Sequence, residues 1–328
     1  MTQEKEQLQA LLLKKFLIQK PPILFRSFLR HMRLFAAKNP RYSPPSVPTP
    51  TARVYLAAGL IAFASTALHA ESYPVDEISI AELENAYTSG KATAHDVTQA
   101  FLERIATYDK KGPALGAIIM VNPHALEDAD KLDATLKRTG KPVGPLHGVP
   151  ILIKDNYDVA GLQTTGGSAA MLGWFPPKDS TAVAKLRAAG AIIVAKTTMS
   201  EWARGGYDNI NSVLPGFARN PYNTAYATGG SSGGTGSGLA ANFGVVGMGS
   251  DTWGSIRNPS SNNALVGIRP TVGLVSRAGM IGLYTARDTA GPMARSVTDL
   301  VTTLDVVVGP DPADTDTAAA SGHIPKSY

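Results

Sequence analysis

The chain has 328 residues, a formal net charge of +5 and no cysteine. Hydrophobic residues make up 44% and charged residues 17%, an ordinary globular composition with room for one large domain or two small ones. The lack of cysteine excludes disulfides, thiolate nucleophiles and cysteine-based metal sites. Residues 1–70 carry a charge of +8 and residues 71–328 carry −3, so the basic balance does not indicate a nucleic-acid-binding surface.

The N-terminal segment has the composition of a leader and a targeting signal. Residues 1–52 are basic and end in a Pro-rich stretch, which predicts a disordered leader. Residues 54–68 form an apolar run of 15 residues, shorter than the roughly 20 that a membrane-spanning helix needs. Small residues follow, as in a secretory signal, although the basic segment before the run is unusually long for one. We therefore predict that residues 53–70 are a signal peptide and that the protein is exported, periplasmic or secreted. There are two alternatives, an uncleaved N-terminal anchor and a chance apolar helix. If the apolar segment is not a signal, the protein would be cytoplasmic.

Helical and strand patterns alternate from residue 71 onward. Apolar residues recur at helical spacing over 79–108 with a break at Gly90, which predicts two amphipathic helices. The other predicted elements are a strand over 117–121, a helix over 124–138, a strand over 149–153, a helix over 181–189, a strand over 191–195 and a helix over 297–308. This alternation indicates an α/β fold.

The glycine- and serine-rich segment 229–238 admits four interpretations. A phosphate-binding P-loop needs a lysine followed by serine or threonine after the last glycine, but Leu239 follows. A dinucleotide fingerprint needs another glycine spacing and a strong apolar strand before it. A hydrolase nucleophile elbow centred on Ser232 needs a later histidine, and only His323 follows. A flexible linker does not fit the core-like sequence of 239–249, so the small residues indicate close backbone packing.

Four ordered motifs resemble those of the amidase signature family. They are GPLHGVPILIKDN at 144–156, GGSSGG at 229–234, DTWGSIR at 251–257 and GIRPTVGLVS at 267–276. The resemblance implies an amidase signature domain over residues 71–328, with a mixed, twisted central sheet covered by helices on both faces. It also implies hydrolysis of a carboxylic acid amide to an acid and an amine or ammonia, through an acyl-enzyme.

The family's catalytic triad consists of a lysine, a serine in a cis peptide and a nucleophilic serine. These fall on Lys154, Ser231 and Ser255, which implies that Ser255 attacks the carbonyl while Ser231 relays its proton to Lys154. A free lysine has a pKa of about 10.4 and is a poor base at neutral pH, but burial lowers that pKa. Lys154 closes an apolar strand, which fits a buried amine. His147 lies in the same motif, and we expect it to have a structural role.

The resemblance also assigns residues around the triad. The oxyanion hole is expected to consist of the backbone N–H groups of Thr252, Trp253, Gly254 and Ser255. Three further residues are expected to support the site, namely Ser232, Asp251 and Arg257, the last two as a charge-assisted pair. Trp202 and Tyr207 either line the substrate pocket or are ordinary packed aromatics. Trp253 stands where the family most often has glycine, and its indole would narrow or shield the site.

The resemblance implies no metal and no organic cofactor. The expected partner is a small-molecule amide substrate, with no nucleic acid, and with a membrane only through the N-terminal segment. Family members continue well beyond the GPDP segment at 309–312, so we expect the chain to be C-terminally incomplete. Two alternative functions stay open: a truncated, catalytically impaired remnant, and an A-type subunit of glutamyl-tRNA amidotransferase. The apolar run at 54–68 argues against the second, which would be cytosolic.

Overall fold

The computed structural model describes residues 72–204, residue 214 and residues 216–328. The chain divides into two units, Met1–Ala70 and Glu71–Tyr328, and the description below concerns the second. The predicted leader, the predicted signal or anchor and Tyr207 lie outside the described residues. Within the described part, no helix is long and apolar enough to cross a membrane.

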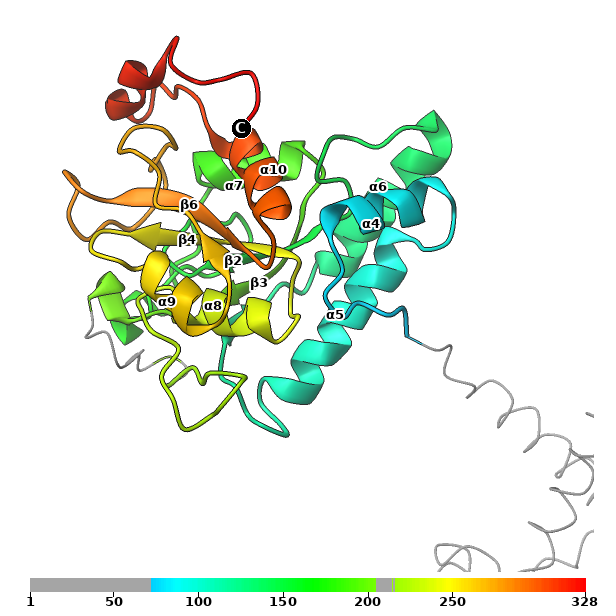
Figure 1. Ribbon diagram of the computed structural model, residues 1–328, viewed down its shortest axis with the longest axis horizontal. Helices are drawn as coiled ribbons and strands as arrows, with labels where there is room; N and C mark the ends of the chain where they lie inside the picture. Colours follow the sequence, from blue (N-terminus) through cyan, green and yellow to red (C-terminus); the bar gives the residue numbers. More distant parts are fainter. Residues whose placement is uncertain (1–71, 205–213, 215) are drawn as a thin grey trace, which may run out of the picture. The chain divides into compact units, whose positions relative to one another are not determined.

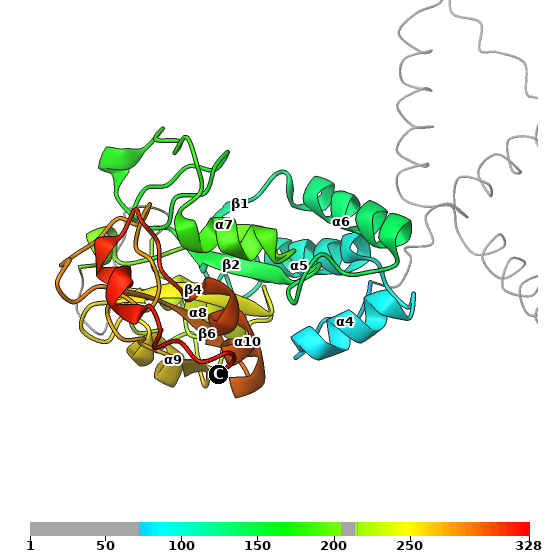
Figure 2. The same cartoon turned by 90° about the horizontal axis from the view of Figure 1, so that it is seen from above.

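Three helices group at one end of the domain (Figure 2): α4 (Ile80–Thr88), α5 (Ala94–Tyr108) and α6 (Ala125–Thr139). The first two begin at reciprocal capping boxes, in which the N-cap hydroxyls of Ser79 and Thr93 accept backbone N–H groups. Gly90 has φ +71 and separates these two helices, as the sequence pattern predicts.

A single mixed sheet forms the centre of the domain, with strand order β1-β3-β2-β4-β6-β5. Its strands are β1 (Ile118–Val121), β2 (Pro150–Lys154), β3 (Ile192–Thr197), β4 (Val246–Asp251), β5 (Val266–Gly267) and β6 (Thr289–Ala294). The strand β2 is parallel to both of its neighbours, β3 and β4, and the other pairs are antiparallel. β2 is therefore buried at the middle of the sheet, and its last residue ends inside the protein.

Helices cover both faces of this sheet, which confirms the predicted fold class. Figure 1 shows α7 (Thr181–Ala188) and α10 (Val297–Val307) on one side, and α8 (Gly233–Ala240) and α9 (Arg257–Asn262) on the other. Short 3₁₀ helices lie at Ala169–Met171, Glu201–Ala203 and Thr315–Ala320. The predicted helices and strands outside the glycine-rich region agree with the observed ones to within about two residues, the usual uncertainty of element ends.

The glycine-rich segment forms the helix α8, which the sequence pattern does not predict. Glycine disfavours helix by about 1 kcal/mol relative to alanine, so tertiary packing must stabilise this element. A Cβ atom on Gly234 would lie 2.3 Å from the carbonyl oxygen of Thr198 and 2.6 Å from that of Ala117. The absence of side chains thus lets α8 lie directly against the backbone of the residue after β3 and of the residue before β1, which confirms the expected close packing.

We predict that Gly234→Ala destabilises the domain by about 3 kcal/mol or more, because the added methyl group meets rigid backbone atoms. Gly161→Ala is the control: it has φ +81 but no atom within 4 Å of the added Cβ, and should cost about 1–2 kcal/mol. Urea unfolding of the two variants measures the difference. Equal losses would show that α8 does not need this close approach.

Candidate active site

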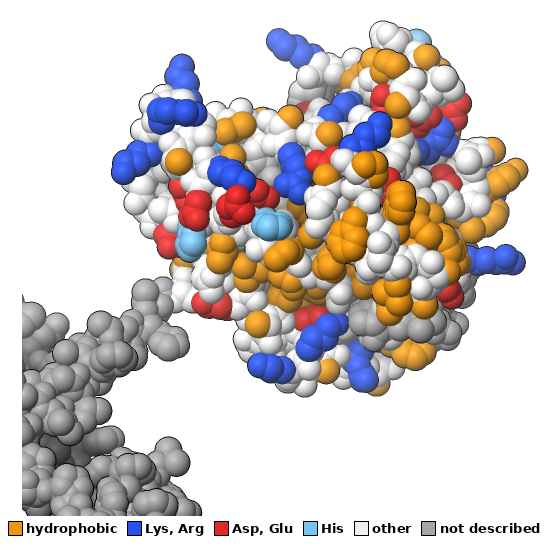
Figure 3. Space-filling model, turned by 180° about the vertical axis from the view of Figure 1, so that it is seen from behind, with side chains coloured by type: hydrophobic (Ala, Val, Ile, Leu, Met, Phe, Trp, Pro, Cys, Tyr) orange, Lys and Arg blue, Asp and Glu red, His pale blue; other side chains and the backbone are white. Residues whose placement is uncertain are grey.

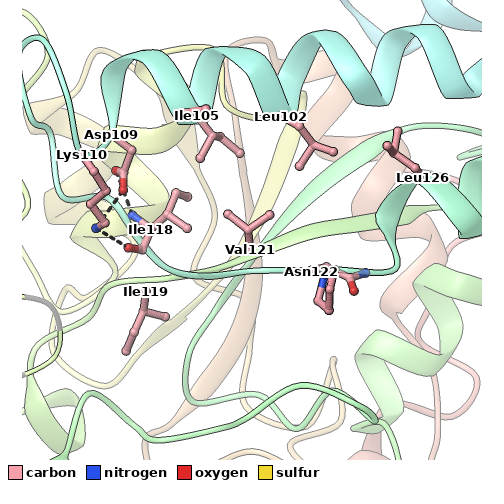
Figure 4. Close-up of a pocket in the computed structure, with 11 residues that line it drawn as sticks. Leu102, Ile105, Asp109, Lys110, Ile118, Ile119, Val121, Asn122 and Leu126 are labelled. Carbon is pink, nitrogen blue, oxygen red and sulfur yellow. Dashed lines mark hydrogen bonds and ion pairs between the residues drawn. The ribbon is translucent and has the colours of Figure 1, made fainter. Parts of the chain in front are cut away.

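A cavity of about 420 Å³ lies beside the edge strand β1, between α5 and α6 (Figure 4). Its lining is mainly apolar, with Asp109 and Lys110 as its charged residues. These two pair with each other at 2.8 Å, and both bond to the backbone of β1. Their polar groups therefore hold the edge strand in place. The lining of the cavity contains no serine or threonine. Hydrophobic side chains are also spread over the face seen in Figure 3.

The geometry at the end of β2 is different, because a lysine amine lies there among hydroxyl groups. Lys154 is fully buried. Its Nζ donates to Ser231 Oγ at 2.7 Å and to Ser250 Oγ at 2.9 Å. Burial lowers the pKa of Lys154 to about 7, against the opposing attraction of Asp251 and Asp288. A substantial fraction of this amine is therefore uncharged at neutral pH.

Ser231 and Ser232 lie in the turn that enters α8. The peptide bond between Gly230 and Ser231 is cis, as the resemblance implies. Ser232 ties this turn to its surroundings: its Oγ donates to the carbonyl oxygen of Ser250 at 3.2 Å, and its N–H donates to the carbonyl oxygen of Ser255 at 3.2 Å. Ser232 thus connects the turn both to β4 and to the loop after β4.

Ser255 lies in that loop and is half-buried. The structure brings Lys154 and Ser231 into direct contact, whereas among the described residues no hydrogen bond joins the hydroxyls of Ser231 and Ser255. The two serines are connected instead by the backbone bond from Ser232 to Ser255. Contacts of this kind often tighten only when substrate binds, so the geometry is compatible with a relay between the two hydroxyls.

Asp251 determines the conformation of the Ser255 loop. Its buried carboxylate accepts the backbone N–H groups of Gly254 at 2.7 Å and Ile256 at 3.1 Å. It also pairs with Arg257 at 3.1 Å and with Arg269 at 3.4 Å. Burial raises the pKa of Asp251, but the hydrogen bonds from Arg257 and from the loop outweigh this effect and lower the pKa below its usual value. The expected Asp251–Arg257 pair is present, and Arg269 is a partner that the sequence reasoning missed.

The bond from Gly254 to Asp251 corrects one expectation. The Gly254 N–H was expected in the oxyanion hole, but it is directed at the carboxylate of Asp251 at 2.7 Å. A donor engaged in this way is not available for a developing oxyanion. Thr252, Trp253 and Ser255 are the candidate donors that remain.

Two further polar residues, Asn156 at the end of the first motif and Ser250 directly before the third, contact the buried amine or its partner. Ser250 Oγ accepts from Lys154 and, at 3.1 Å, from Asn156 Nδ2. Asn156 also donates to the carbonyl oxygen of Ile281 at 2.9 Å. Their closeness in sequence to predicted site residues could have identified them, because Asn156 is two residues after Lys154 and Ser250 directly precedes Asp251.

Asp288 is another residue that the sequence reasoning missed. It is buried, and it accepts a short hydrogen bond from the hydroxyl of Thr252. Its second carboxylate oxygen accepts the N–H groups of Leu283 and Tyr284, both at 2.8 Å. Asp288 therefore fastens the turn 283–288 to the loop that carries Ser255.

Trp202 and Trp253, the two aromatic residues that the sequence singles out within the described part, are both exposed. Trp202 donates its backbone N–H to the carbonyl oxygen of Gly166 at 2.8 Å, and a role for its side chain in lining the pocket stays a prediction. The Trp253 ring stacks on Tyr284 with centroids 6.1 Å apart and planes at 12°.

His147 accepts the N–H of Val143 at 3.1 Å, which agrees with the structural role expected for it. Among the described residues, no cluster of three or more His, Asp or Glu side chains could hold a metal ion.

The lowered pKa of Lys154 predicts a pH dependence of stability. Between the folded pKa of about 7 and the unfolded value of about 10.4, the unfolded chain binds more protons at this residue. The contribution of Lys154 to the free energy of unfolding should therefore rise with pH across that window, by up to about 1.4 kcal/mol per pH unit. Lys154→Met should lack this increase, whereas Lys141→Met, at an exposed position, should keep it. Urea unfolding at several pH values measures the free energy of unfolding of each variant. If it changed with pH equally for wild type and Lys154→Met, the lowered pKa would be contradicted.

We predict that Asp251→Asn costs about 3 kcal/mol of stability, because it leaves buried N–H donors and two arginines without a carboxylate. Asp316→Asn is the control, since it removes an exposed ion pair with Arg277 and should cost less than about 1 kcal/mol. Both are read from denaturant midpoints. A loss of the control's size for Asp251→Asn would show that the loop does not depend on this carboxylate.

Comparison with known proteins shows which proteins this chain is similar to. The family model named Amidase matches residues 96–327. The A-type subunit of glutamyl-tRNA(Gln) amidotransferase from Symbiobacterium thermophilum is 39% identical over 249 residues, which cover 76% of this chain and 49% of that protein. A probable amidase from Arabidopsis thaliana is 38% identical over 265 residues, which cover 78% of this chain and 50% of that protein.

Solved structures of amidases also match this chain. The native peptide amidase from Stenotrophomonas maltophilia superimposes with a TM-score of 0.72 at 42% identity, covering 78% of this chain and 52% of that one. An amidase family protein from Bacillus anthracis superimposes with a TM-score of 0.71 at 35% identity, with coverages of 75% and 50%. The chain thus spans about half the length of the relatives it matches.

Proposed function

Since the chain belongs to the amidase signature family, we propose that it hydrolyses carboxylic acid amides with Ser255 as nucleophile, Ser231 as proton relay and Lys154 as base. The observation that carries this proposal is the buried Lys154 amine, 2.7 Å from Ser231 Oγ and with a pKa of about 7. A serine hydroxyl is a weak nucleophile unless a base is near, and the uncharged amine is such a base. Its lone pair can accept the Ser231 proton across the same distance.

The reaction begins with proton transfer. Ser231 gives its proton to Lys154 and receives that of Ser255, whose oxygen forms a bond to the amide carbonyl carbon. The carbonyl oxygen becomes an oxyanion, which the backbone N–H groups of the 252–255 loop would stabilise, Gly254 excepted. A single well-placed donor of this kind lowers a barrier by roughly 3 kcal/mol.

The amine must then leave, and water must complete the cycle. The proton on Lys154 returns through Ser231 to the amide nitrogen as the carbon–nitrogen bond breaks, which leaves an acyl group on Ser255. Water attacks the acyl carbonyl, gives a proton to Ser231 and regenerates the Ser255 hydroxyl with release of the acid. Every proton thus passes through Ser231, the hydroxyl in contact with the buried amine.

A second candidate function comes from the curated relatives, because the amidotransferase protein from Symbiobacterium thermophilum is 39% identical to this chain. In that case the chain would release ammonia from glutamine in association with other subunits. The assay that separates the two functions is glutamine hydrolysis by the isolated chain, compared with hydrolysis of simple aliphatic and aryl amides. Export of the protein is a further proposal that rests on the apolar run at 54–68 alone.

We predict that Ser255→Ala lowers kcat/KM by about 10⁴-fold or more, and Ser231→Ala by about 10²–10⁴-fold. The wild-type kcat/KM should rise about tenfold per pH unit up to pH 7 and level off above it, because the base must be unprotonated. Ammonia release from acetamide and benzamide measures both effects. Ser327→Ala, an exposed serine that bonds to Asp305, is the matched control and should leave the rate unchanged. Equal rates for wild type and Ser255→Ala would refute the proposal.

A further inference from the structure

Trp253, Tyr284 and Arg287 form an exposed cluster, called here the aromatic platform. Trp253 and Tyr284 are 50% and 49% exposed although their rings stack on each other. The guanidinium carbon of Arg287 lies 5.2 Å from the centre of the Trp253 ring. Large aromatic side chains that share a surface with a cation are typical of binding sites, because they offer a broad apolar face and a charge together.

The platform lies next to the nucleophile. Trp253 precedes Ser255 by two residues on one loop, so their Cα atoms are within roughly 7 Å of each other. A substrate whose carbonyl carbon is bonded to Ser255 would therefore have a ring-sized substituent within reach of the Trp253 indole.

Hydrogen bonds to Asp288 and from Arg269 also hold the platform in place. Asp288 fastens Tyr284 through its N–H and Thr252 through its hydroxyl, which sets the two rings against each other. Arg269 donates to the carbonyl oxygen of Arg287 at 2.8 Å and pairs with Asp251 at 3.4 Å, which ties the other end of the turn to the same loop. A platform fixed in this way loses little conformational freedom when it binds a ligand.

The platform itself carries a positive charge, that of Arg287. Arg287 is the cation at the Trp253 ring, and the nearby carboxylates Asp251 and Asp288 are buried under hydrogen bonds. The charge next to the exposed Trp253 ring is therefore that of Arg287. Such a surface attracts anionic groups and repels cationic ones.

We propose that the aromatic platform binds an aromatic ring of the amide substrate, and that Arg287 favours anionic over cationic substituents on that ring. The inference rests on the proposed amidase site and names its substrate class: arylalkyl amides, neutral or acidic. Trp253, which departs from the glycine usual in the family, is then a specificity-determining residue.

Binding to the full chain carrying Ser255→Ala tests the platform without turnover. We expect calorimetry to show 2-phenylacetamide binding about 5- to 10-fold more tightly than 2-cyclohexylacetamide, since aromatic contacts add to apolar burial. Adding Trp253→Ala should remove this preference, and Tyr284→Ala should reduce it. Tyr108→Ala is the matched control, because Tyr108 is an exposed tyrosine with Arg104 5.4 Å from its ring, on α5. Thermal melting checks that each variant is folded. Equal affinities for the two amides, or a preference that survives Trp253→Ala, would overturn the proposal.

A second pair of ligands tests Arg287. In the Ser255→Ala background, phenylacetamide with a para-carboxylate should bind at least about fivefold more tightly than phenylacetamide with a para-aminomethyl group. Arg287→Gln should abolish this difference, so that the two charged ligands bind with equal affinity. An unchanged ratio in Arg287→Gln would refute the role of Arg287. Ring-selective binding without ammonia release by the wild type would refute the proposed function but support the platform. Ammonia release without ring selectivity would support the proposed function and refute the platform.

Discussion

The burial of one lysine amine is the constraint on which the candidate site depends. Lys154 ends the central strand of a mixed sheet, flanked by parallel strands on both sides, where water does not reach its Nζ. A buried ammonium without a countercharge is costly, and the polar groups within hydrogen-bond distance are the oxygens of Ser231 and Ser250. The amine lowers that cost by losing its proton near neutral pH. The close approach of α8 matters for the same reason, because the glycines that press this helix onto the sheet also bring Ser231 to the amine.

A second buried lysine shows that burial alone does not produce a base. Lys196 of β3 is as inaccessible as Lys154, and burial lowers its pKa as well. Its Nζ, however, lies 2.9 Å from a carboxylate oxygen of Asp155, which favours the charged form. Lys196 is paired with Ile153 in the register, whereas Lys154 is paired with Thr197, so by strand alternation the two amines face opposite sides of the sheet. One face thus holds an ion pair that fastens Thr164 and Thr165, and the other holds an amine among hydroxyls.

The sequence predicted the parts of this structure that depend on local chemistry. The helices α4 and α5 follow from apolar spacing and from the N-caps Ser79 and Thr93, and burial of Lys154 follows from the apolar strand before it. The sequence could not predict α8 or β4, because glycine and serine have low intrinsic propensity for either structure and packing decides the outcome. Partners from distant segments were also missed. Asp288 lies 36 residues from the threonine that it fastens, and no spacing rule connects the two.

The loop of Ser255 explains how the family's usual glycine at position 253 can be replaced by tryptophan. Gly254 has φ +117, a conformation that L-residues with side chains rarely adopt, and this geometry directs its N–H to Asp251. Trp253 has no positive φ, so a side chain at this position meets no backbone restriction of that kind. Glycine is therefore required at 254 by the backbone, whereas at 253 the backbone permits a side chain. Because the N–H of residue 253 is the same in either case, a substitution there can change the wall of the site while leaving the backbone donors of the loop in place.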